Sequence, residues 1–139
     1  MSADLYQAEL VARAREAFGK GRLTNAAATV TLDNPLCGDR VTIDLAREDG
    51  RVSAIGHEVK GCLLCEAAAA TIAAFGRDKT PEELRGMRRA VSALMKDGTP
   101  APESFSGLAV FTPVHKAKSR RDCVLLPFEA LEKALAAAF

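Results

Sequence analysis

Tryptophan is absent from this 139-residue chain, tyrosine occurs once, and aromatic residues make up only 5% of it. The core must therefore be built mainly from small and aliphatic side chains. Long apolar runs are lacking too, since none approaches the roughly 20 residues that a membrane span requires. Neither sign of charge is in surplus, because 19 basic and 18 acidic residues leave a formal net charge of +1. Nucleic-acid binding and electrostatic membrane attachment both need a basic surplus, so the composition speaks against both.

The overall composition is that of an ordinary globular protein, with 48% hydrophobic and 27% charged residues. A chain of this length suits one domain, which we expect to span 1–139. The first seven residues, 1–7, have neither the basic start nor the apolar stretch of a secretory signal, which predicts a cytoplasmic protein. In that reducing compartment the four cysteines are not expected to form disulfides. They are then either buried small hydrophobes or part of a metal or redox site.

The pattern of apolar residues predicts an α+β fold, in which a three-stranded antiparallel sheet has helices packed on one face. Strands are expected at 28–32, 40–45 and 51–59, and helices at 4–18, 62–75, 80–96 and about 121–138. The first two strands alternate aliphatic residues with Thr or Asp, so the sheet should have one covered side and one polar side. In the segment 104–118 the apolar residues do not recur at a convincing helical or strand spacing, so no element is predicted there.

Local signals mark the ends of these elements. Glu48-Asp49-Gly50 predicts a tight hairpin turn, because glycine accepts the positive φ that such turns need. Thr80-Pro81-Glu82-Glu83 predicts a helix start, with threonine as the N-cap, proline at the first position and glutamate completing a capping box. Gly56 suggests a bulge inside the third strand, and Pro127 limits where the interior of the last helix can begin.

Each cysteine allows a functional and a structural interpretation. Cys37 lies in an Asn-Pro-Leu-Cys-Gly-Asp turn, where Gly38 would let the sulfur and the Asp39 carboxylate point at one centre. Cys62 opens a helix, where free N–H groups and the helix dipole favour a thiolate. Cys123 lies near the start of the last helix, and the basic residues before it are expected to lower its pKa. Taken singly, each could also be an inert turn or core residue.

Cys62 and Cys65 form a C-x-x-C motif at a helix start, an arrangement that thiol–disulfide oxidoreductases also use. The structural alternative, in which Cys65 only packs within its alanine-rich helix, is slightly favoured. The two histidines, His57 and His115, precede Cys62 and Cys123 along the chain. A lone histidine is more often a surface or hydrogen-bonded residue, so neither is expected to be a metal ligand.

Together the cysteines favour a metal site. Three of them lie at turns or helix starts and one of these is close to an aspartate, as expected for ligands that converge on one ion. Three thiolates and one carboxylate, from Cys37, Asp39, Cys62 and Cys123, can complete a tetrahedral shell for zinc or ferrous iron. Thiolates also hold Fe–S clusters, to which an oxygen ligand binds less tightly than sulfur. Such labile attachment suits a carrier.

Three separated segments also carry a family resemblance. They are Asn34-Pro-Leu-Cys-Gly-Asp-Arg-Val41, Gly61-Cys62 followed by the alanine run 67–70, and Cys123 followed by Val124-Leu-Leu-Pro-Phe-Glu-Ala-Leu131; a Leu5-Tyr6 helix start fits as well. In these segments the chain resembles the iron–sulfur cluster assembly scaffold family of the NifU N-terminal domain, IscU and SufU. The resemblance runs in order along nearly the whole chain, and it implies the same α+β fold.

The resemblance implies that Cys37, Asp39, Cys62 and Cys123 form an exposed site for a metal or a nascent cluster. Family members receive sulfur from a cysteine desulfurase as a cysteine-bound persulfide, combine it with iron, and pass the cluster to a downstream Fe–S carrier or apo-protein. Cys37 or Cys123 would be the sulfur acceptor. Zinc or iron would be the bound metal, and the Fe–S cluster a transient cargo. On this interpretation the protein is a scaffold rather than an enzyme.

Further features make the chain more similar to the SufU-type branch. Asp122 stands before the third motif cysteine, where IscU-type members carry histidine, and no Leu-Pro-Pro-Val-Lys segment for a chaperone is present. The stretch between Cys62 and Cys123 is long, as in SufU-type members, which can act as zinc-dependent sulfur acceptors. Two alternatives therefore remain: a zinc-dependent sulfurtransferase that accepts persulfide without assembling a cluster, and a C-x-x-C thiol oxidoreductase.

Overall fold

The computed structural model of the chain describes residues 8–36 and 38–139. Its strands form an antiparallel sheet in the order β1 (Ala28–Asn34), β2 (Asp39–Glu48) and β3 (Arg51–Lys60). These are the three predicted strands, each extended by one or a few residues. The α+β class and the antiparallel pairing are therefore confirmed.

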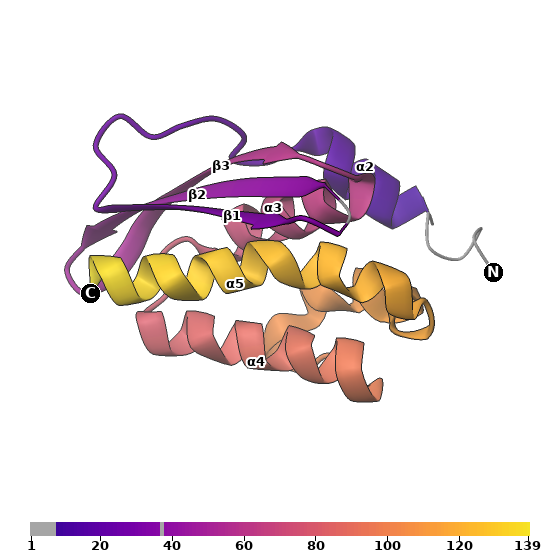
Figure 1. Ribbon diagram of the computed structural model, residues 1–139. Coiled ribbons are helices and arrows are strands. Elements are labelled where there is room, and N and C mark those ends of the chain that lie inside the picture. The colour runs from indigo at the N-terminus through magenta and orange to yellow at the C-terminus, as the bar shows by residue number, and fades with distance from the viewer. Residues whose placement is uncertain (1–7, 37) are drawn as a thin grey trace.

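Within residues 8–36 and 38–139, four α-helices and two 3-10 helical segments make up most of the structure outside the sheet. They are α2 (Ala8–Glu16), α3 (Leu63–Gly76), α4 (Pro81–Asp97), η1 (Glu103–Lys116), η2 (Lys118–Arg120) and α5 (Arg121–Ala138). Helices α3 and α5 pack against one face of the sheet, α2 lies beside α3, and α4 packs on α5 away from the sheet (Figure 1). The segment 104–118, for which the sequence predicted no element, consists mostly of η1, whose backbone leaves the helical conformation at Phe105.

Helix α3 lies at the centre of the molecule because its side chains are small. Ala67–Ala70 and Ala73 are all buried, on several sides of the helix. A helix that is apolar all round must be covered all round, and alanine lets neighbouring backbones approach closely. The two largest fully buried side chains come from other elements, Phe111 from η1 and Phe128 from α5, and α3 adds Leu64 and Ile72.

The predicted turn and cap signals are confirmed. Asp49 and Gly50 have φ values of +53° and +76°. A two-residue type I′ hairpin turn requires positive φ at both of its central residues. Thr80 caps α4: its hydroxyl accepts from Glu83 N–H at 3.2 Å, and its own N–H donates to the Glu83 carboxylate at 3.0 Å. Helix α5 begins at Arg121 and continues through Pro127, which forgoes one intrahelical hydrogen bond.

The predicted bulge at Gly56 is wrong. Gly56 pairs in register with Asp44, and the irregularity in the β2–β3 ladder falls between Ala46 and Arg47. The reason for glycine at position 56 is space, because a Cβ there would lie 2.5 Å from the Gly21 carbonyl oxygen. The glycine thus marks a close approach of another segment rather than a break in pairing.

That segment, residues 17–27, covers part of the sheet face that the sequence predicted to be polar. Asp44, on this face, is 0% exposed. Its carboxylate accepts hydrogen bonds from the Arg22 guanidinium at 2.7 and 3.2 Å, from Leu23 N–H at 3.0 Å and from the Thr29 hydroxyl. The segment 17–27 therefore shields part of the polar face of the sheet from solvent, and the Arg22–Asp44 ion pair holds it there.

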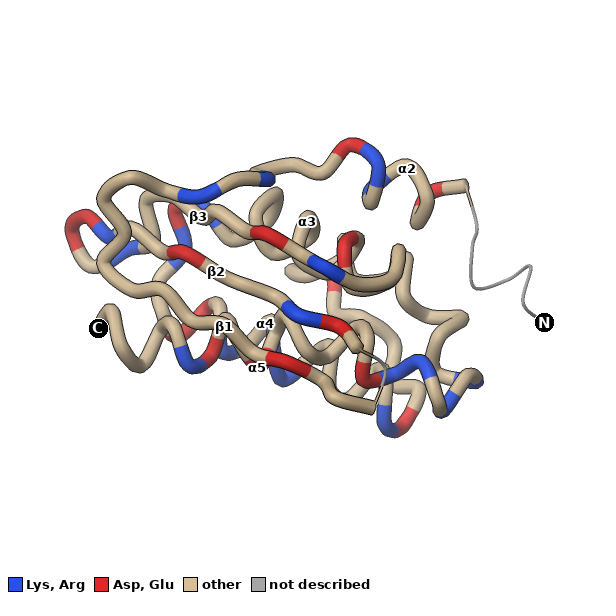
Figure 2. The backbone as a smooth tube through the Cα atoms, turned by 45° about the horizontal axis from the view of Figure 1, so that its top comes forward, with Lys and Arg blue, Asp and Glu red and all other residues tan. Residues whose placement is uncertain are grey.

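The N-terminal helix was expected at 4–18. It ends at Glu16, because Ala17 adopts a φ of +48° that leaves the helix; positions 4–7, with Leu5 and Tyr6, lie outside the described residues. In the described part of the chain, no helix is both long and apolar enough to cross a membrane. Basic and acidic residues are interspersed along the chain (Figure 2).

Candidate metal centre

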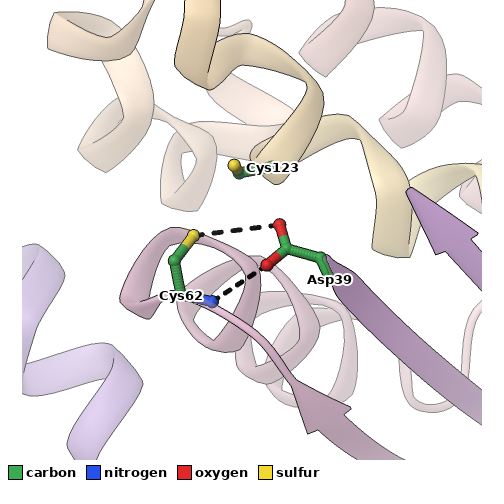
Figure 3. A group of neighbouring side chains, drawn as sticks. All are labelled: Asp39, Cys62 and Cys123. Carbon is green, nitrogen blue, oxygen red and sulfur yellow. Dashed lines mark hydrogen bonds between the residues drawn. The ribbon is translucent and has the colours of Figure 1, made fainter. Parts of the chain in front are cut away.

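Three elements that are distant in sequence bring potential metal ligands together. Asp39 is the first residue of β2, Cys62 is the N-cap of α3, and Cys123 lies in the first turn of α5. Each offers one ligand atom, and these atoms all lie within 4.8 Å of one another. Figure 3 shows the two sulfurs and the carboxylate facing a common point. The structure thus assembles three of the four predicted ligands.

The two oxygens of Asp39 contact different groups. Oδ1 accepts a hydrogen bond from the backbone N–H of Cys62 at 3.1 Å, and Oδ2 lies 4.0 Å from Cys62 Sγ (Figure 3). The side chain of Cys62 makes no capping hydrogen bond of its own. Asp39, only 3% exposed, therefore acts in place of a capping side chain at the start of α3. Its carboxylate accepts a hydrogen bond from a free N–H group of the first turn, and its negative charge interacts favourably with the helix dipole.

Cys123 is 1% exposed. Burial raises the pKa of its thiol, and the neighbouring Cys62 and Asp39 raise it further because they disfavour another negative charge. The predicted lowering of this pKa is therefore wrong. Of the basic residues on which that prediction rested, Lys116 and Lys118 are exposed, and the Arg121 guanidinium donates to the His115 carbonyl oxygen at 2.8 Å.

Cys37, the fourth predicted ligand, lies outside the described residues, so its place at the centre stays a prediction. The described residues next to it do form a turn. Gly38 has a φ of +74°, a left-handed conformation that favours glycine, and its N–H donates to the Asn34 carbonyl oxygen at 2.8 Å. Leu36 is 93% exposed. Asp39 follows this turn directly.

Cys65 and the two histidines are not part of the group. Cys65 is 0% exposed and packs in the hydrophobic core one turn after Cys62, which favours the structural interpretation over a C-x-x-C redox pair. His57 Nε2 lies 2.7 Å from the carbonyl oxygen of Phe18, and burial lowers the pKa of this imidazole. His115 Nδ1 lies 2.9 Å from the Met95 carbonyl oxygen.

The donor set suits a borderline-soft divalent cation. Zinc takes thiolate sulfur at about 2.3 Å and carboxylate oxygen at about 2.0–2.2 Å, so ligand atoms around one ion lie roughly 4 Å apart. The observed spacing of at most 4.8 Å is close to this value and needs only a small contraction. Two sulfurs and one oxygen also leave a fourth position for another ligand, as in open metal sites.

Comparisons with known proteins identify relatives of this chain. No family model matches the sequence. The zinc-dependent sulfurtransferase SufU of Bacillus subtilis is 27% identical over 95% of this chain and 90% of its own length. The scaffold protein IscU of Streptococcus pyogenes is 24% identical over 94% of this chain and 82% of its own.

A solved structure is similar to this chain over nearly its whole length. The N-terminal part of a NifU-like protein from Brucella abortus superposes with a TM-score of 0.92 and 33% sequence identity, over 99% of this chain and 96% of that one. The chain belongs to the NifU/IscU/SufU-like scaffold family. In this NifU/IscU/SufU-like protein, the family resemblance seen in the sequence and the geometry of the three ligands therefore point to the same centre.

The sequence alone did not reveal how this NifU/IscU/SufU-like centre is held together. It placed Asp39 beside Cys37 as a ligand and gave no reason to expect its hydrogen bond to the N–H of Cys62. A signal was present in the pairing of the second and third strands. The ladder includes the pair Arg40 and Lys60, so one further antiparallel step places Asp39 opposite Gly61, directly before Cys62.

Proposed function

We propose that the chain is an iron–sulfur cluster assembly scaffold that accepts sulfur from a cysteine desulfurase and binds iron, zinc or a nascent cluster. Asp39, Cys62 and Cys123 would hold the cargo, with Cys37 as the fourth ligand. The observation that carries the proposal is the convergence of two sulfurs and one carboxylate, from β2, α3 and α5, within 4.8 Å. Membership of the NifU/IscU/SufU-like family supports it.

The residues suggest a division of roles. The proposed sulfur acceptors are Cys37, for which the sequence predicts a turn, and Cys123, which is buried. Transfer needs no oxidant: the acceptor thiolate attacks the outer sulfur of the donor's persulfide, and the donor leaves as a thiolate. Asp39 offers a hard oxygen among soft sulfurs, which makes release of a cluster easier than a fourth thiolate would. A downstream Fe–S carrier or apo-protein would receive it.

The proposal is tested by anaerobic reconstitution of the purified chain with ferrous iron, L-cysteine and a cysteine desulfurase. We expect visible-region absorbance to develop in the parent protein and to be lost in Cys37→Ala, Cys62→Ala and Cys123→Ala. Cys65→Ala is the matched control, because this cysteine lies in the core outside the centre, and it should reconstitute like the parent. If all three ligand variants bind iron and sulfur as the parent does, the proposal is wrong.

A second candidate is a zinc-dependent sulfurtransferase that accepts persulfide without assembling a cluster. The relative from Bacillus subtilis, which carries that name and covers nearly the whole chain, favours it, as does Asp122 in the place of a histidine beside Cys123. The same reconstitution separates the two functions. Tightly held zinc and a protein-bound persulfide, with no visible absorbance under any condition, would favour the sulfurtransferase.

A further inference from the structure

Gly61 is the residue that faces Asp39 across the sheet. Arg40 of β2 pairs with Lys60, the last residue of β3, and the next antiparallel step brings Asp39 opposite Gly61. Side chains at opposite positions lie on the same face of a sheet. A residue with a side chain at position 61 would therefore share its space with the Asp39 carboxylate.

The structure leaves no room for even one carbon there. A Cβ built on Gly61 would lie 2.9 Å from Asp39 Cγ and 3.2 Å from Asp39 Cβ, and closer still to Oδ1. Backbone conformation does not explain the glycine, because the described glycines with positive φ are Gly19, Gly21, Gly38, Gly50 and Gly98. Space for the Asp39 side chain is thus the reason for glycine at position 61.

The position of that side chain decides what its two oxygens reach. The carboxylate leans across Gly61, so that Oδ1 meets the N–H of Cys62 at 3.1 Å and Oδ2 is directed toward the sulfur of Cys62. The Asp39 backbone is fixed, because it pairs with Asn34 of β1 and the next residue, Arg40, pairs with Lys60 of β3. The clash caused by a methyl group at position 61 would be relieved most easily by turning the Asp39 carboxylate away from the centre.

We propose that Gly61 is a positioning residue of the metal centre, which holds Asp39 in its ligating orientation by leaving space for it. This inference rests on the proposed function, because it takes Asp39 as a ligand. Substitutions beside metal ligands that disturb their orientation weaken metal binding by about 10- to 100-fold. Gly61→Ala should weaken zinc binding to this degree while the metal-free protein stays folded.

The experiment is a zinc competition titration against a chromophoric chelator, together with thermal unfolding of the metal-free proteins. Gly86→Ala is the matched control. It makes the same change in α4, where a Cβ would meet the Phe105 ring at 3.6 Å and the Arg89 guanidinium at 3.7 Å, both ordinary contact distances. We expect Gly86→Ala to bind zinc like the parent. Gly61→Ala should bind about 10- to 100-fold more weakly.

A double-mutant cycle distinguishes positioning from a general structural effect. In an Asp39→Ala background no carboxylate remains to be displaced, so adding Gly61→Ala should cause no further loss of zinc affinity. An equal loss in both backgrounds, or parent-like affinity of Gly61→Ala, would overturn the inference and leave the proposed function intact. A parent protein that binds neither zinc nor iron would instead overturn the proposed function, and the inference with it.

Discussion

Asp39 combines a structural and a ligating role in a single side chain. Oδ1 is held by the N–H of Cys62, and Oδ2 faces the sulfurs. The carboxylate therefore stabilises the start of α3 and completes the donor set at the same time. The two roles depend on different oxygens, which allows them to be separated by substitution.

Asparagine at position 39 should keep one role and remove the other. Asp39→Asn retains an oxygen that can accept from Cys62 N–H, but its amide nitrogen is not a metal ligand. Asp39→Ala loses both. We expect zinc affinity to fall by about tenfold or more in both variants, while Asp39→Ala alone loses a further 1 kcal/mol or so of unfolding free energy in the metal-free protein. Chelator competition and urea unfolding measure the two effects, and parent-like zinc binding by Asp39→Asn would contradict the ligand role.

Helix and strand ends in this protein are set by short local motifs. The capping box at Thr80 and Glu83 starts α4, and Gly98, with a φ of +71°, ends it. Neither feature touches the metal centre. The boundaries of α4 should therefore affect stability without affecting function.

Removing the Thr80 hydroxyl tests this separation. Thr80→Ala leaves the N–H of Glu83 without its acceptor, so the free energy of unfolding should fall by about 1 kcal/mol. Thr80→Ser keeps the hydroxyl and is the control, with stability close to the parent. Zinc affinity should be unchanged in both. A loss of metal binding in Thr80→Ala would show that α4 is coupled to the centre.

At the scale of the whole molecule, Asp44 fastens the segment 17–27 onto the sheet. Burial by itself would raise the pKa of Asp44, but hydrogen bonds from Arg22, Thr29 and the N–H of Leu23 outweigh it and lower the pKa. A carboxyl whose pKa is lower in the folded state stabilises the protein above its unfolded pKa. That stabilisation is lost as the pH falls through the folded-state pKa.

The free energy of unfolding of the parent should therefore decline as the pH drops below about 4. Asp44→Asn should cost roughly 2–3 kcal/mol at neutral pH, because its amide cannot accept from all these donors, and its stability should depend less on acid. Asp33→Asn is the control: the Asp33–Arg40 pair is exposed and should contribute less than about 1 kcal/mol. Urea unfolding between neutral and acid pH measures both, and equal losses in the two variants would contradict the prediction.

The strands, the hairpin turn and the capping box were predictable, because each depends on residues close together in sequence. Two-residue alternation, a positive φ at Asp49-Gly50 and an N-cap at Thr80 are local properties. Gly56 shows the limit of such arguments. A glycine inside a strand indicates either a bulge or a close approach, and here Gly21, distant in sequence, decided between them.

The sequence by itself determined the α+β elements and the residue types able to bind a metal. Only the tertiary structure decided that Asp39 bonds to the N–H of Cys62, that Cys123 is buried with a raised pKa, and that Asp44 is covered by the segment 17–27. The physical reason is separation along the chain. Burial and electrostatic surroundings come from neighbours brought by other elements, and periodicity within one element carries no information about them.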